Sequence, residues 1–233
     1  MTRYSTHDRW PRVRQRTLGR LTSAAIFAGL AVALLLCGCG SNSGGGGTTA
    51  PANLAIGQPY GGGVVAYILQ PGDPGYVAGQ THGLIAAAAD QTEVAGSGVQ
   101  WATEPYYSTY VAGALGTAVG SGAANTNAII AQNGSGTNYA AGLARAYNGG
   151  GYSDWFLPSR DELNELYLNR VAIRGFETTT NHPWYWSSSQ IQDSAVNADH
   201  AWLQSFYEDN YHPGYQTSEI KYSPVRVRAV RAF

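Results

Sequence analysis

The sequence predicts a mixed domain of short strands and a few helices over residues 54–233. Apolar runs of strand length, bounded by Gly, Pro and Asp, stand near both ends of this region, and alanine-rich or capped helical segments stand between them. The region contains no cysteine, so no disulfide supports it. Its 180 residues are nevertheless long enough to bury one substantial core.

Five segments have the patterns of strands. They are residues 63–69, 83–89, 184–188, 201–206 and 224–233. The first two are short apolar runs, as expected of buried strands, and a Pro- and Gly-rich turn at 71–75 separates them. The last segment alternates Val225, Val227 and Ala229 with Arg226 and Arg228, which is the two-residue period of a strand with one buried face.

Three segments have the patterns of helices. Residues 125–132 and 138–147 are rich in alanine, and Asn148 with three glycines ends the second. The third helix is expected over 159–170, because Ser159 can cap it and Glu162 completes a capping box. Its apolar residues are expected on one face: Leu163, Leu166, Tyr167 and Val171.

A basic and then apolar leader precedes the domain. Six arginines stand before an apolar run of 16 residues at 21–36. At about 1.5 Å per residue the run spans roughly 24 Å, which is less than the roughly 30 Å of a bilayer's hydrocarbon core. The pattern therefore favours a cleaved signal over a permanent spanning helix.

The leader ends in Leu36-Cys37-Gly38-Cys39, which resembles the lipobox of bacterial lipoproteins. The resemblance implies a signal peptide at 1–38 and lipid attachment to Cys39, followed by a flexible Gly/Ser linker that completes residues 39–53. Gly40 is not the aspartate associated with retention in the inner membrane, so the outer membrane is favoured. An ordinary secretory leader or an uncleaved anchor is the alternative, and either would still export the domain.

The exported part of the chain is mildly acidic. From Cys39 onward it has eight basic and fourteen acidic residues, a net charge of −6. Nucleic acids would be repelled at long range, so a nucleic-acid partner is not expected.

Several motifs together resemble one bacterial family. They are His82-Gly83-Leu84-Ile85-Ala86-Ala87, Asp90-Gln91, Trp101, Asn138-Tyr139-Ala140-Ala141, the residues 150–163 (GGYSDWFLPSRDEL), Tyr185-Trp186-Ser187-Ser188-Ser189, Ala201-Trp202 and Val227-Arg228-Ala229-Val230-Arg231. In order and spacing they are similar to the C-terminal domain of the Legionella collagen-like adhesin. The resemblance covers roughly residues 56–233, and the run at 150–163 is its most specific part.

The resemblance implies a compact α+β, C-type lectin-like domain of short, largely antiparallel strands with two to three helices. It also implies a binding role at a cell surface, with glycan or extracellular matrix ligands. The adhesin carries its domain on a trimerising collagen-like stalk, whereas this chain has a short linker behind its leader, so the oligomeric state is not carried over.

Catalytic patterns are weak in the exported domain. Its four histidines form no HExxH motif, and no nucleophile elbow surrounds Ser187, Ser188 and Ser189. We therefore expect no enzyme, no cofactor and no metal, with a hydrolase as a remote alternative. Asp154 and Asp161 are considered as calcium ligands, but a calcium site requires a denser set of oxygen ligands.

Large aromatic residues near the third helix are expected to be structural. Trp155, Phe156 and Leu157 precede it and are interpreted as core residues that fix how the helix meets the sheet. Trp186 and Trp202 are likewise expected in the strand core.

Two turn-rich segments supply the candidate ligand site, because exposed aromatic rings can stack on sugars and polar neighbours can bind hydroxyl groups. The candidate residues are Tyr106, Tyr107, Tyr110, Asp209, Asn210, Tyr211, His212 and Tyr215. The alternative is that these tyrosines only pack long loops onto the domain. The sequence thus favours a surface adhesion or glycan-binding lipoprotein, with a structural envelope lipoprotein as the second possibility.

Overall fold

The computed structural model describes residues 50–233 except Ala52 and the segments 93–97, 180–182, 192–197 and 209–212. The predicted signal peptide, Cys39 and most of the predicted linker lie outside the described residues. None of the helices in the described part is long and apolar enough to cross a membrane.

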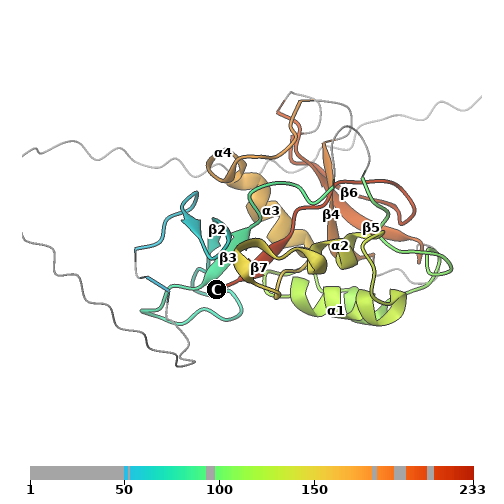
Figure 1. Cartoon of the computed structure of the whole chain (residues 1–233), viewed down its shortest axis with the longest axis horizontal. Coiled ribbons are helices and arrows are strands. Elements are labelled where there is room, and N and C mark those ends of the chain that lie inside the picture. Colours follow the sequence, from blue (N-terminus) through green and yellow to red (C-terminus); the bar gives the residue numbers. More distant parts are fainter. Residues whose placement is uncertain (1–49, 52, 93–97, 180–182, 192–197, 209–212) are drawn as a thin grey trace, which may run out of the picture. The chain divides into compact units, whose positions relative to one another are not determined.

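The first sheet joins the beginning of the domain to its end. It consists of β1 (Pro59–Tyr60), β2 (Gly63–Ile68), β3 (Gly83–Ala86) and β7 (Val230–Ala232) in the order β1-β2-β3-β7, with antiparallel neighbours throughout. The predicted strands at 63–69 and 83–89 are confirmed. Figure 1 shows the C-terminal strand beside β3, so both ends of the described chain belong to one structural unit.

The second sheet is β4 (Trp184–Gln190), β5 (His200–Ser205) and β6 (Gln216–Ile220), antiparallel in this order. The strands predicted at 184–188 and 201–206 are present, whereas β6 was not predicted. The segment predicted as one strand at 224–233 forms β7 only at its end. Before β7 it makes isolated bridges at Val225 and Arg226.

The helices lie between β3 and β4 in sequence. They are α1 (Gly122–Asn133), α2 (Ala140–Ala146), α3 (Arg160–Leu168) and the single turn α4 (Arg170–Ile173), with 3-10 turns at Ala112–Ala114 and Gly149–Gly151. All three predicted helices are therefore present. Together the elements make a compact α+β fold with two small antiparallel sheets (Figure 1).

The expectation that Val171 shares the buried face of α3 is wrong. Leu163 and Leu166 are buried, but Val171 is 74% exposed. The helix ends before it, because Asn169 leaves the helical conformation with φ −99° and ψ 8°. Val171 therefore belongs to α4, whose separate turn directs it to solvent.

The segment before α3 is structural, as predicted. Trp155 and Leu157 are fully buried in one apolar cluster, and Phe156, which points the other way, packs in a second cluster with Tyr185 and Phe206. The side chains alternate because the segment is extended, so three consecutive residues contribute to both halves of the core.

The start of α3 is fixed by the predicted capping box. Ser159 Oγ accepts from the Glu162 amide at 3.3 Å, and Glu162 Oε2 accepts from the Ser159 amide at 2.7 Å. Glu162 is fully buried, and its Oε1 also accepts from the Gly120 amide at 2.8 Å. Burial raises the pKa of this carboxyl group above its usual value, although the backbone hydrogen bonds oppose the shift.

Candidate ligand site

A groove of about 480 Å³ lies on one face of the β4–β5–β6 sheet. The residues that line it come from all three strands and from the turn that follows β6. They are Trp184, Leu203, Thr217, Glu219, Ser223, Pro224 and Val225. This volume is within the range of about 300–1,000 Å³ that is typical of small-molecule sites.

Strand register places these side chains together. Leu203 on β5 pairs with Thr217 on β6, and Ala201 pairs with Glu219. Side chains two residues apart on a strand share a face, so Thr217 and Glu219 point the same way as Leu203. Their common face forms the floor of the groove.

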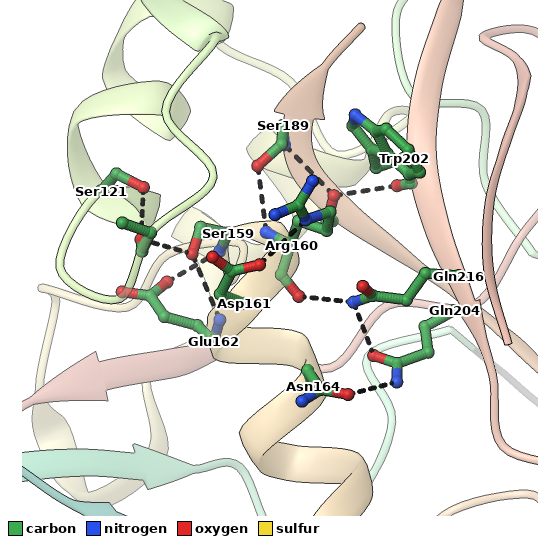
Figure 2. A network of polar contacts seen from close by, with 12 residues as sticks. Ser121, Ser159, Arg160, Asp161, Glu162, Asn164, Ser189, Trp202, Gln204 and Gln216 are labelled. Atoms are coloured by element: carbon green, nitrogen blue, oxygen red, sulfur yellow. Dashed lines mark hydrogen bonds and ion pairs between the residues drawn. The ribbon is translucent and has the colours of Figure 1, made fainter. Parts of the chain in front are cut away.

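The opposite face of this sheet is covered by α3. Gln204 Nε2 donates to Asn164 Oδ1 at 2.9 Å, and Gln216 Nε2 donates to the Arg160 carbonyl at 2.9 Å (Figure 2). The Arg160 guanidinium lies 5.2 Å from the centre of the Trp202 ring. Trp202 is only partly buried, so its assignment to the strand core is wrong: it packs under a surface arginine instead.

The turn after β6 forms one wall of the groove and holds its charged residue. Glu219 Oε1 accepts from Ser223 Oγ at 3.3 Å and from the Ile220 amide at 3.0 Å. The Ser223 amide donates to the Ile220 carbonyl at 3.0 Å, which closes the turn. Among the described residues both hydrogen bonds to the carboxylate involve Oε1, which fixes its orientation and leaves Oε2 able to accept from a ligand hydroxyl.

The groove combines groups that suit a neutral polyhydroxylated ring. The partly buried Trp184 offers an indole surface, and Thr217 and Ser223 offer hydroxyl groups. Glu219 is the only charged residue among the described residues that line it. An apolar aromatic surface with a few fixed polar groups is the usual composition of a small-ligand site, and a carboxylate accepts hydrogen bonds well.

The predicted tyrosines of the first loop are mostly packed against the protein. Tyr107 donates its hydroxyl hydrogen to Gln100 Oε1 at 2.5 Å, and its ring makes an edge contact with Tyr222 at 5.9 Å between centroids. Tyr106 packs against the larger core cluster, and the Tyr110 carbonyl accepts from Gln132 Nε2 at 3.2 Å. These contacts support the packing interpretation for this loop.

The second predicted loop is described only at its end. Asp209, Asn210, Tyr211 and His212 lie outside the described residues, whereas Tyr215 is 52% exposed. Tyr215 immediately precedes β6, and Tyr222, the contact of Tyr107, follows its end. The five residues of β6 lie between these positions, and at about 3.4 Å per residue the strand spans roughly 17 Å. The structure therefore does not bring Tyr107 and Tyr215 together.

The residues that the groove adds were not predicted as site residues. Trp184 carried only a strand pattern, and the polar stretch at 216–220 has no apolar alternation that would identify its buried face. Glu219 and Ser223 stand four residues apart next to Tyr222 and Pro224, which is a turn signal without a ligand signal.

The two aspartates considered for calcium are engaged by arginines. Asp154 receives two hydrogen bonds of 2.8 Å from Arg231, which lower its pKa. Asp161 pairs with Arg160 at 2.8 Å. The carboxylate oxygens of both aspartates are therefore used in ion pairs with arginines.

The motif segments of the sequence lie in the fold described above. A comparison of the chain with known protein families identifies the family to which they belong. The Lcl C-terminal domain family matches residues 91–231. The chain belongs to this family. No curated protein matches the chain. The Lcl C-terminal domain match includes all three strands and the turn that build the groove, but it begins after β3, the strand that pairs with β7.

Membership of the Lcl C-terminal domain family identifies the matched part as an adhesin-related domain. It points to a protein exposed at the surface or in the envelope and to a role other than catalysis.

Proposed function

We propose that this chain is a lipid-anchored envelope protein whose C-type lectin-like domain binds glycans through the groove on the β4–β5–β6 sheet. The observation that carries the proposal is the convergence of Trp184, Glu219 and Ser223 on one open cavity. The domain's adhesin-related family supports a binding role at the cell surface.

The lining of the groove favours neutral sugars over sulfated ones. A sulfate group is recognised by arginine or lysine, and the described lining offers the Glu219 carboxylate instead. The net charge of −6 from Cys39 onward acts in the same direction at long range. The ligand class is therefore a neutral glycan chain of a host or matrix surface, one or two rings of which enter the groove.

Attachment to the membrane through Cys39 would hold the domain at the outer surface of the cell envelope. The lipobox-like end of the leader and the Gly-rich linker support this part of the proposal. A linker of 14 residues, from 40 to 53, has a root-mean-square span on the order of 20 Å, which keeps the domain close to the bilayer.

A glycan array probed with the mature protein tests the binding function. We expect at least one neutral glycan to bind, and we expect Glu219→Gln to weaken it. Replacing the carboxylate removes a charge-assisted hydrogen bond, worth about 1.5–3 kcal/mol. Binding should change little with salt, since no described cation lines the groove.

Glu208→Gln is the matched control, because Glu208 is exposed and lies outside the groove. An array without any hit would favour a structural envelope protein. Hits confined to sulfated glycans, with a steep loss of affinity in salt and no effect of Glu219→Gln, would contradict the proposed groove.

A further inference from the structure

The corner between α3 and α4 exposes the two most solvent-accessible large apolar side chains of the described chain. Val171 is 74% exposed and Leu168 is 59% exposed. Both lie within a short segment in which α3 ends and the turn of α4 begins. Isolated apolar residues are common on surfaces, whereas adjacent ones mark a candidate contact.

Arginines flank these apolar side chains. The Arg170 guanidinium lies 4.2 Å from the centre of the Tyr167 ring and donates to the Tyr167 carbonyl at 2.9 Å. Arg174 is exposed. The segment 167–175 contains these two arginines and no acidic residue, and Glu165 and Glu177 lie just outside it, so the charges of the corner itself are both positive.

The chain passes this corner as it enters the domain. Leu54 is buried, Ile56 is 37% exposed, and Gly57 lies directly against α4. A Cβ atom at Gly57 would stand 3.0 Å from the Ala172 carbonyl oxygen, and its φ of +89° also favours glycine. The predicted linker, which ends at residue 53, thus reaches the folded domain beside the exposed apolar corner.

We propose that Ile56, Leu168 and Val171, together with Arg170 and Arg174, dock the domain on the anionic phospholipid surface to which its linker is attached. The proposal rests on the lipid attachment proposed above. A short linker that joins the domain at this corner keeps the corner near the bilayer, where apolar side chains enter the interface and arginines attract anionic headgroups.

Docking by this corner leaves the groove accessible. The helix α3 packs on the face of the β4–β5–β6 sheet that carries Trp202 and Gln204, whereas the groove opens on the face that carries Leu203. The membrane contact and the glycan contact therefore use different sides of this sheet.

Hydrogen exchange of the mature protein on vesicles tests the docking. Vesicles of phosphatidylcholine are compared with vesicles that also contain phosphatidylglycerol. We expect severalfold slower amide exchange over 167–175 on the anionic vesicles, with unchanged exchange over 216–220 in the groove-forming strand. The double variant Leu168→Ser, Val171→Ser should abolish this protection. Arg174→Gln should reduce the protection on the anionic vesicles and leave exchange on the phosphatidylcholine vesicles unchanged.

Mass spectrometry of Cys39 separates this proposal from the anchoring on which it rests. If Cys39 carries no lipid, the anchoring is wrong, and the same exchange experiment is done with Cys39 coupled to a maleimide lipid. In either form of attachment, equal exchange over 167–175 with and without anionic lipid would overturn the docking face. Protection that depends on protein concentration in the absence of vesicles would also overturn it, because a second copy would then cover the corner.

Discussion

The two faces of the β4–β5–β6 sheet use alternate residues of the same strands in opposite ways. On the face under α3, the Gln204 side chain donates to Asn164 Oδ1 and to the Gly214 carbonyl and accepts from Gln216 Nε2 (Figure 2). On the other face, Leu203 and Thr217 border an open cavity. Polar groups on the first face are engaged within the protein, whereas those on the second face can bind a ligand.

The difference shows why the most distinctive sequence motif does not mark the ligand site. Residues 150–163 lead into α3 and are used in the core: Phe156 packs in the cluster with Leu163 and Tyr185, and Trp155 and Leu157 pack in the cluster that includes Leu203. The open face is built from residues with weak sequence signals, Trp184 and Glu219 among them.

Trp155→Ala should have the largest effect and should act on stability. The side chain is fully buried, makes an edge contact with Tyr147 at 4.7 Å and donates to the Gly149 carbonyl at 3.3 Å. We expect the free energy of unfolding to fall by roughly 3–5 kcal/mol, as for other large core truncations. Chemical denaturation measures this free energy. An unchanged midpoint together with lost glycan binding would show that this motif binds the ligand and is not part of the core.

Lys221, which follows β6 directly, should make stability depend on pH. It is fully buried, its ammonium group donates to the Thr109 carbonyl at 2.7 Å, and burial lowers its pKa to about 8. Between this value and the usual pKa of about 10.4, the unfolded chain binds more protons than the folded protein, so stability rises with pH.

The expected gain from pH 8 to pH 10 is on the order of 2 kcal/mol. Above about pH 10 the buried Tyr185 opposes it, because burial raises the pKa of its phenol and the unfolded chain then loses that proton first. In thermal melts, Lys221→Met should reduce the increase of the melting temperature between pH 8 and pH 10. A wild-type protein that loses stability between pH 8 and pH 10 would contradict the assignment.

Tyr107→Phe should have a smaller effect and separates packing from binding in the first predicted loop. It removes the hydroxyl group that donates to Gln100 and keeps the ring against Tyr222. We expect a loss of about 1 kcal/mol of stability without a change in glycan affinity. Tyr222→Phe, which keeps the same ring pair, is the control. A loss of affinity at full stability would restore the loop as the ligand site.

Local signals predicted much of the fold. The capping box of Ser159 and Glu162 acts within one helical turn, so the start of α3 could be identified from four residues. β6 could not be identified, because its strand is formed by hydrogen bonds to β5 rather than by an apolar alternation of its own. Val171 was misplaced because the sequence does not show that Asn169 ends the helix.

The candidate site was less predictable than the fold. Aromatic residues in turn-rich segments indicated Tyr107 and Tyr215 as site residues. Tyr107 packs on Tyr222 at one end of β6, whereas Tyr215 stands at the other end, and the sequence did not predict this strand. The groove arises when β5, β6 and the turn at Ser223 meet in one register, and no single segment contains that information.

Titration of a glycan identified on the array with Trp184→Ala and Trp202→Ala tests the assignment of the two faces most directly. The two tryptophans lie on neighbouring strands, but Trp184 lines the groove and Trp202 lies under Arg160 on the opposite face. We predict that Trp184→Ala loses stacking worth on the order of 1 kcal/mol of affinity beyond the lost contact area, while Trp202→Ala binds as the wild type does. Equal affinities for the two variants, or a loss confined to Trp202→Ala, would contradict the account.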